Sequence, residues 1–573
     1  MEPLSVDVRL GIRIPLRDGI HLGGTLYSPA GGTDPSACIL LLTPYTTDLY
    51  HERGMYFAAH GLRFLAVDVR GRGDSEGVFR PLTQEARDGY DAVEWLARQP
   101  FCNGKVAMWG GSYNGYVQWA TASEFPPHLA TFVPAASLFP GLDFPMRNNI
   151  FHPYVVQWLA FTSGHALQTA LHSDKAFWSS LYREWHESGR PFRELETVLG
   201  RRFPAFREWL AHPEPDPYWD ALNPTAEQYA RLGMPILTIT GSYDDDQPGA
   251  LEHYRRHLLN APVDSPAQHY LIIGPWDHAG TRTPSAQFGG LTFGAASLLD
   301  LPGLHLEWYR WTMGGGPKPG FLEKPVAYYV MGAECWRHAE TLAAITAREE
   351  PCFLGSKTRA DDALASGSLG AEAGSGAPDS YVYDPRDTRG PEVQAEARGE
   401  GGSLVDQGLL LALRGRQLVY ETTPFDRDME VSGFFRLVAW IAIDRPDTDF
   451  YVSVHEVDPD GGSIRLSTDA MRARHRAGLR TTQLIATDEP LLYEFQRFTF
   501  VSRRVSTGHR LRLVVAPVGR LAEATFTQKN YNGGGVVADE SVRDAQPVTV
   551  RLFHDRAHPS VLYIPIGQPE SAS

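Results

Sequence analysis

The chain is organised around the stretch Met108-Trp109-Gly110-Gly111-Ser112-Tyr113-Asn114-Gly115-Tyr116. A strand-like apolar run (106–109) leads into two glycines and a serine, and a segment with helical character (117–122) follows. A serine at a sharp turn from strand to helix is the arrangement of a nucleophile elbow, where side chains beside the serine would clash. The usual spelling is Gly-x-Ser-x-Gly, whereas here the second glycine comes one residue late, as Gly115. The alternative is a Gly-Gly loop followed by an Asn-Gly hairpin turn.

The length and composition are those of a globular protein with several domains. A chain of 573 residues predicts two or three domains, and 43% apolar with 21% charged residues is an ordinary globular composition. The net charge of −15 argues against nucleic acid as a partner, because little could neutralise a phosphate backbone. The cysteines lie far apart, which favours free thiols in a reducing compartment over a disulfide framework. They are Cys38, Cys102, Cys335 and Cys352.

The sequence shows no targeting or membrane pattern. Residues 1–9 have neither the basic nor the apolar region of a signal peptide. No stretch approaches 18 uncharged apolar residues, so no membrane span is expected. We therefore expect a cytoplasmic protein that does not act at a membrane. Whether it forms a homo-oligomer is left open.

Strands and helices alternate along residues 1–141 and again along 225–350. We predict a hairpin over 6–27, strands at 39–42, 64–69, 106–109, 235–241 and 270–274, and a helix over 83–98. This alternation is typical of an α/β fold on a largely parallel sheet. We assign both stretches to one α/β-hydrolase domain.

Two other segments have different patterns. Residues 142–224 are rich in aromatic residues at helical spacing and show no clear strands. This pattern predicts a helical cap inserted between the two halves of the sheet. A separate helical domain is the alternative. Residues 351–573 are predicted to hold a linker, rich in Gly, Ala and Ser over 357–402, and a β-sandwich of the jelly-roll type.

Two further residues fit the chemistry of a serine nucleophile. Such a serine needs a general base, and the base needs an orienting carboxylate, in the chain order Ser, Asp, His after successive strands. Asp244 follows the predicted strand 235–241, and His278 follows 270–274. A helix cap and a surface loop are the alternatives for the two residues. Their order at strand ends favours a catalytic triad of Ser112, Asp244 and His278.

Motifs along nearly the whole chain carry a family resemblance. They are Pro15-Leu16-Arg17-Asp18-Gly19, Asp68-Val69-Arg70-Gly71-Arg72-Gly73-Asp74-Ser75-Glu76-Gly77, Gly110-Gly111-Ser112-Tyr113-Asn114-Gly115, Tyr243-Asp244, Gly274-Pro275-Trp276-Asp277-His278, Tyr383-Asp384-Pro385, Asp447-Thr448-Asp449-Phe450 and Gly508-His509-Arg510-Leu511. With them the chain resembles the cocaine esterase-like hydrolases, which include α-amino-acid ester hydrolases and X-prolyl dipeptidyl aminopeptidases. The resemblance implies an α/β-hydrolase domain with a helical cap, a C-terminal jelly roll and the same triad.

The resemblance also implies an oxyanion hole. One donor would be the backbone N–H of Tyr113, which follows the nucleophile. The second would be the hydroxyl of Tyr45, which follows an early strand in Thr43-Pro44-Tyr45. A phenol suits this role because it donates a hydrogen bond without carrying charge at pH 7. Aromatic packing at a strand end is the alternative for Tyr45.

Three other motifs are not assigned a function. The glycines of 71–77 do not match a dinucleotide fingerprint, and Asp458-Pro459-Asp460-Gly461 lacks the remaining ligands of a calcium loop. His253 and His257 have the i, i+4 spacing of a zinc helix, but no Glu follows His253, and both are expected on a solvated helix face. We predict neither a metal nor a cofactor.

The substrate class depends on acidic residues near the triad. In the α-amino-acid ester hydrolases carboxylates hold the ammonium group of the substrate, and the resemblance assigns this role to Asp143 and Asp246. The match is partial because Gln247 stands where the family has a second adjacent carboxylate, and solvated turn acids are the alternative.

Three functions follow, in order of expectation. The first is a serine hydrolase that cleaves a small carboxylic ester, amide or short peptide through an acyl-enzyme on Ser112. The second is an α-amino-acid ester hydrolase or acyltransferase, or an X-prolyl-type aminopeptidase, that recognises an ammonium group. The third is a catalytically inactive binding protein on the same fold.

Overall fold

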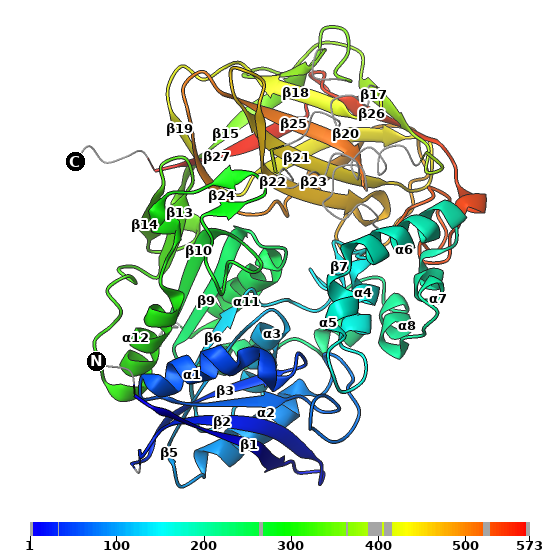
Figure 1. Ribbon diagram of the computed structural model, residues 1–573. Helices are drawn as coiled ribbons and strands as arrows, with labels where there is room; N and C mark the ends of the chain where they lie inside the picture. The colour runs from blue at the N-terminus through cyan, green and yellow to red at the C-terminus, as the bar shows by residue number, and fades with distance from the viewer. Residues whose placement is uncertain are drawn as a thin grey trace.

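The computed structural model describes residues 4–32, 34–262, 268–361, 365–387, 404–405, 415–518 and 528–568. These residues form a hydrolase domain around one sheet, a helical insert beside it and a C-terminal β-sandwich (Figure 1). Among them, no helix is long and apolar enough to cross a membrane. All four cysteines are free thiols, of which Cys38 and Cys102 are buried.

The hydrolase sheet has, within the described residues, ten strands in the order β1-β2-β4-β3-β5-β6-β9-β10-β13-β14. The pairs from β4 to β13 are parallel, and β1, β2 and β14 add antiparallel edges. Its strands are β1 (Val6–Pro15), β2 (His21–Pro29), β3 (Ser36–Thr43), β4 (Arg63–Asp68), β5 (Cys102–Gly111), β6 (Leu129–Ala135), β9 (Ile236–Tyr243), β10 (His269–Asp277), β13 (Val326–Val330) and β14 (Cys335–Ala339). The predicted hairpin and parallel sheet are confirmed.

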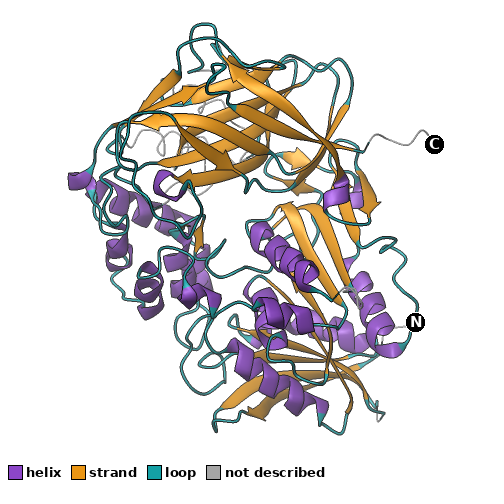
Figure 2. Cartoon of the chain, turned by 180° about the vertical axis from the view of Figure 1, so that it is seen from behind, coloured by secondary structure: helices purple, strands orange, loops and turns teal. Residues whose placement is uncertain are grey.

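Helices cover both faces of this sheet (Figure 2). They are α1 (His51–Ala59), α2 (Glu85–Ala97), α3 (Tyr113–Ala122), α10 (Ala226–Arg231), α11 (Gln247–Asn260) and α12 (Leu301–Gly314). Successive side chains of β3 point to opposite faces, so Leu40 packs in the core under α2 and α3, whereas Ile39 packs in the core under α1 and α12. A strand buried on both faces must be apolar throughout, which explains the continuous run Ile39–Leu42.

The helical insert lies between β6 and β9. Its helices are α4 (Tyr154–Phe161), α5 (Thr169–Ser173), α6 (Lys175–Ser188), α7 (Leu195–Val198), α8 (Pro204–Leu210) and α9 (Pro217–Asp220). The insert begins with a small hairpin that the sequence did not predict, β7 (Met146–Arg147) and β8 (Ile150–Phe151). Its turn holds Asn148 and Asn149 at φ values of 51° and 66°, a conformation that asparagine tolerates better than most residues.

The C-terminal domain is a β-sandwich of the jelly-roll type with a core of alternating apolar side chains. Its strands are β15 (Thr346–Gly355), β16 (Gly367–Gly370), β17 (Asp379–Tyr383), β18 (Leu418–Thr422), β19 (Met429–Gly433), β20 (Arg436–Ile443), β21 (Asp449–Val457), β22 (Ser463–Arg472), β23 (Leu491–Phe495), β24 (Val501–Val505), β25 (Arg510–Pro517), β26 (Val548–Phe553) and β27 (Val561–Gly567). The first strand, β15, pairs antiparallel with the last, β27.

The segment 357–402, predicted to be linker and loops, is not a linker in its described part, because its strands β16 and β17 belong to the sandwich and the other described residues form loops beside them. Residues 388–402 lie outside the described residues. The small residues that suggested a linker serve packing instead, since a Cβ on Gly367 would meet the ring of Tyr420 at 2.4 Å. A glycine in this strand therefore allows close approach of an aromatic side chain.

Candidate active site

Ser112 occupies a strained turn between β5 and α3. Its φ of 63° and ψ of −130° lie in a region that residues other than glycine rarely adopt. Glycine neighbours are required here, because a Cβ on Gly110 would meet Asn114 Cβ at 2.6 Å, and one on Gly115 would meet the carbonyl of Ala135 at 2.9 Å. The late glycine thus lets α3 pack closely on the end of β6. The elbow geometry is present, and the alternative of a Gly-Gly loop with a hairpin turn is wrong.

Asp244 and His278 form a hydrogen-bonded pair at the ends of β9 and β10. His278 Nδ1 lies 2.8 Å from Asp244 Oδ1, and Thr240 Oγ1 donates to the other carboxylate oxygen at 2.8 Å. The side chain of Asp244 is fully buried. Burial lowers the pKa of His278, but the charges of Asp246 and Asp244 outweigh it, so that the net shift is upward. This arrangement orients the imidazole and stabilises its protonated form.

Ser112 and His278 line the same cavity, of about 490 Å³. Within the described residues, no hydrogen bond joins the two side chains. Contacts between a nucleophile and its base are often loose without substrate and tighten in the complex.

The hydroxyl of Tyr45 also faces this cavity. It accepts a hydrogen bond of 3.0 Å from Trp158 Nε1, and its ring stacks on Phe161 at 5.8 Å. Burial raises the pKa of Tyr45 well above its usual value, while the hydrogen bond from Trp158 lowers it. Because Trp158 donates to the oxygen of Tyr45, the O–H hydrogen of Tyr45 points away from Trp158 and is left to donate within the cavity that Ser112 also lines. Sequence reasoning missed Trp158, which is one of many aromatic residues in the insert.

The backbone N–H of Tyr113 has no acceptor inside its own helix. The N–H groups of Gly115 and Tyr116 both bond to the carbonyl of Ser112, whereas Tyr113 is the first residue of α3. The Tyr113 side chain points away and bonds to the buried carboxyl of Glu85, whose pKa burial raises to about 7. The phenol therefore fixes the start of α3, and the amide, next to Ser112, has no acceptor among the described residues.

The two acidic residues expected near the substrate differ in their surroundings. Asp143 is buried, and its carboxylate oxygens accept hydrogen bonds from the N–H groups of Phe139 at 2.8 Å and Gly249 at 2.6 Å. Burial raises the pKa of Asp143 to about 8. Asp246 Oδ2 lies 3.7 Å from His278 Nδ1, too far for a hydrogen bond, and no described side chain or N–H group donates a hydrogen bond to its carboxylate. Both residues line the cavity, but Asp143 already has a structural role.

The C-terminal domain supplies one wall of the cavity. Its lining residues there include Tyr451, Arg465, Thr468, Asp469, Ala470 and Val518. The cavity is also lined by Arg147 and Ile150 of the β7–β8 hairpin and by His152, which follows the hairpin. No sequence pattern indicated these residues, because they meet only when the insert and the sandwich pack together.

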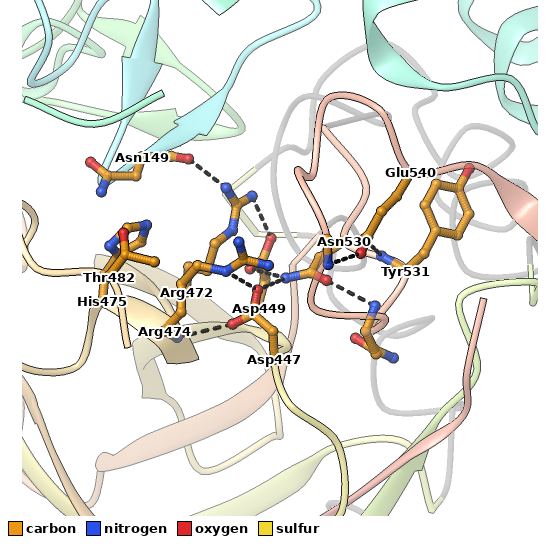
Figure 3. Close-up of polar contacts among 12 residues, drawn as sticks. Asn149, Asp447, Asp449, Arg472, Arg474, His475, Thr482, Asn530, Tyr531 and Glu540 are labelled. Atoms are coloured by element: carbon orange, nitrogen blue, oxygen red, sulfur yellow. Dashed lines mark hydrogen bonds and ion pairs between the residues drawn. The ribbon is translucent and has the colours of Figure 1, made fainter. Parts of the chain in front are cut away.

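The β7–β8 hairpin is fastened to the sandwich by buried polar groups. Arg472 pairs with Asp449 at 2.9 Å and donates from Nη1 to the carbonyl of Asn149 at 2.8 Å (Figure 3). Asn148 Nδ2 donates to Asp469 Oδ1 at 2.9 Å. A buried ion pair of the sandwich thus fixes the hairpin that lines the cavity.

The predicted solvated face at His253 and His257 is wrong. Both imidazoles are fully buried, and His253 stacks on Trp119 at 4.7 Å and bonds to the hydroxyl of Tyr229 at 2.7 Å. The polar neighbours in sequence point to other sides of α11. In the part of the chain that is described, no group of three His, Cys, Asp or Glu side chains is arranged to hold a metal ion.

The fold and this site define a serine hydrolase on the α/β-hydrolase fold, with a helical cap and a C-terminal jelly roll. The family model described as X-Pro dipeptidyl-peptidase (S15 family) matches residues 18–280, and the model of the X-Pro dipeptidyl-peptidase C-terminal non-catalytic domain matches 319–518. The chain therefore belongs to the family of X-Pro dipeptidyl-peptidases and cocaine esterase-like hydrolases, and it cleaves a carboxylic ester or amide.

Individual proteins match over their full length. The cocaine esterase of Rhodococcus sp. (strain MB1 Bresler) is 26% identical, over 98% of this chain and 99% of the relative. An α-amino acid ester hydrolase superposes with a TM-score of 0.84 at 20% identity, covering 98% of this chain and 97% of its own. An aminopeptidase from a marine sediment Thaumarchaeota archaeon superposes at 0.81 with 22% identity, covering 99% and 97%. At these identities the two solved structures show the shared fold.

Proposed function

We propose that Ser112, His278 and Asp244 act as a catalytic triad. His278 takes the proton of Ser112 Oγ through Nε2 as the oxygen attacks the substrate carbonyl, and then gives this proton to the leaving group. Asp244 holds the Nδ1–H side of the imidazole. Water then attacks the acyl-enzyme in the same way and releases the acid, whereas an amine in place of water would give acyl transfer. The strained backbone of Ser112, beside the Asp244–His278 pair, is the observation that carries this proposal.

The oxyanion that forms during each attack would accept two hydrogen bonds. The donors are the hydroxyl of Tyr45 and the backbone N–H of Tyr113. Trp158 supports this role, because its N–H occupies a lone pair of Tyr45 and leaves the hydroxyl hydrogen to point into the cavity. Such donors act mainly on the transition state, where negative charge develops on the carbonyl oxygen.

The test of the triad is Ser112→Ala together with labelling by a fluorophosphonate. We expect a loss of kcat on the order of a millionfold with an unchanged fold by circular dichroism, and covalent labelling of the wild-type protein at Ser112. A variant that keeps a tenth of the activity would disprove the assignment. An unlabelled wild-type protein would favour the inactive binding protein instead.

We further propose that Asp246 recognises an ammonium group on the substrate. Its carboxylate lies at the catalytic cavity, 3.7 Å from His278 Nδ1. Burial raises the pKa of Asp246 despite the opposing charge of His278, because the ionised carboxylate is poorly stabilised there. A bound ammonium group would supply the missing stabilisation of the ionised form. The α-amino acid ester hydrolase and the aminopeptidase that share this fold act, by name, on substrates of this kind.

The test of Asp246 uses matched esters that differ in one amino group. For wild-type enzyme we expect a higher kcat/KM for an α-aminoacyl aryl ester than for its des-amino analogue. Asp246→Asn should remove most of this preference, because a site built to pair a charge discriminates strongly against substrates that lack it. If wild-type enzyme does not prefer the amine, a plain esterase or amidase remains.

A further inference from the structure

A second, open cavity of about 260 Å³ lies beside the catalytic one and shares Arg147 with it. Its walls come from the start of the insert, from α11 and from the C-terminal domain. Three arginines from these three segments line it, namely Arg147, Arg255 and Arg497. The cavity is thus strongly cationic, although the chain as a whole carries a net charge of −15.

None of these guanidinium groups forms a close ion pair with a neighbouring acid in the described chain. Within the described residues, no carboxylate oxygen lies within 4.0 Å of any of the three. Glu252 also lines the cavity, but it pairs with Arg256 at 2.7 Å. Arg255 lies over the ring of Phe434 at 4.5 Å instead. Burial and the charge of Arg497 lower the pKa of Arg255, whereas the charge of Glu252 raises it. The net shift of the pKa is downward.

Arg147 is half-buried between the two cavities. Its one hydrogen bond in the described chain runs from Nη2 to the carbonyl of Thr468 at 3.3 Å. The nearby buried carboxylates are already satisfied: Asp143 by two backbone N–H groups, and Asp469 by Asn148 Nδ2 and by the N–H of Arg497. Most N–H groups of Arg147 therefore remain for a ligand.

We propose that Arg147, Arg255 and Arg497 form a carboxylate-binding subsite, and that the preferred substrate carries a carboxylate group in addition to its scissile ester or amide. Guanidinium groups are suited to this ligand because their planar donors match the two oxygens of a carboxylate. A bound anion would also relieve the mutual repulsion of three cations. Since Arg147 lines both cavities, the anionic group would lie in the second cavity while the scissile bond lies at Ser112. This inference rests on the proposed catalytic function.

The experiment compares phenyl butanoate with two charged analogues. In 4-carboxyphenyl butanoate the carboxylate is on the leaving group, and in monophenyl succinate it is on the acyl group. For wild-type enzyme we expect kcat/KM to be about tenfold higher for at least one charged ester than for phenyl butanoate. The ratio should fall toward one in Arg147→Gln and in Arg497→Gln. The control is Arg231→Gln. Arg231 is the last residue of α10 and lies over the ring of Phe125, so its removal should leave the ratio of kcat/KM values unchanged.

A wild-type enzyme without preference for either charged ester would overturn the proposal, as would an unchanged ratio in both arginine variants. Protection against thermal unfolding by inorganic phosphate, without any substrate preference, would also overturn it by identifying a site for free anions. These outcomes are distinct from failure of the triad, because hydrolysis of phenyl butanoate and its loss in Ser112→Ala report on the triad alone.

Discussion

The indole N–H of Trp158 donates a hydrogen bond of 3.0 Å to the hydroxyl of Tyr45. The two residues come from different parts of the molecule, since Trp158 lies on α4 of the insert and Tyr45 follows β3 of the hydrolase sheet. The insert therefore does more than cover the cavity, because it orients a group of the proposed oxyanion hole.

Tyr45→Phe is expected to lower kcat about a hundredfold or more with little change in KM. The removed hydroxyl acts mainly when negative charge develops on the carbonyl oxygen, and loss of one such donor typically costs about 3 kcal/mol. Steady-state kinetics on an ester with rate-limiting acylation measure the effect. An unchanged kcat would remove Tyr45 from the oxyanion hole.

Trp158→Phe is expected to lower kcat by up to about tenfold, which corresponds to one neutral hydrogen bond. The effect should disappear when Tyr45 is already phenylalanine, because no hydroxyl is then left to orient. A double-mutant cycle with Tyr45→Phe measures this coupling. Losses that simply add would show that Trp158 acts on the substrate rather than through Tyr45.

Arg472→Met is expected to lower the free energy of unfolding by about 3–5 kcal/mol, because it leaves the carboxylate of Asp449 buried without its cation. It should also raise KM, since Arg472 holds the hairpin that lines the cavity. Arg480→Met is the matched control. Its partner Asp220 is half exposed, so this change should cost less than about 1 kcal/mol. Equal losses in urea unfolding would contradict the prediction.

The buried histidines of α11 and β10 predict loss of stability in acid. Burial lowers the pKa of His253 to about 3 and that of His257 and His269 also below the usual 6.5. Below pH 6.5 the unfolded chain therefore binds protons that the folded chain does not, and the free energy of unfolding falls as the pH falls toward 3. At pH 5 the protonation of His253 in the unfolded chain alone lowers the free energy of unfolding by about 2 kcal/mol.

Urea unfolding at pH 7.5 and pH 5 checks this prediction. In His253→Gln the difference in stability between the two pH values should be smaller than in wild type by about the contribution of one histidine. An identical difference in the two proteins would show that His253 is protonated in the folded state.

The parts of the site that sequence could predict depend on short-range rules. The elbow at Ser112 needs small neighbours whatever the rest of the chain does, and a parallel sheet collects the loops that hold Asp244 and His278 at one edge. The positions of these residues follow from strand ends that are visible as apolar runs. The prediction of the parallel sheet succeeded for the same reason.

The parts that sequence could not predict depend on packing between distant segments. Trp158 resembles every other aromatic residue of the insert until α4 lies against the loop after β3. His253 sits among charged residues in sequence, yet its side of α11 faces Trp119. Arg147 is brought to the cavity by a two-strand hairpin too short to give a periodic pattern.

The pairing of β15 with β27 sets the order in which the enzyme is completed during synthesis. Glu350 lies opposite Ile564, so the sandwich cannot close its sheet until residues 561–567 have left the ribosome. All strands and helices of the hydrolase domain precede residue 340 and emerge much earlier. The turn that holds Ser112 is therefore built early in translation, whereas the sandwich that walls its cavity is closed only when β27 has emerged. A nascent chain would present Ser112 before the sandwich wall of its cavity is in place.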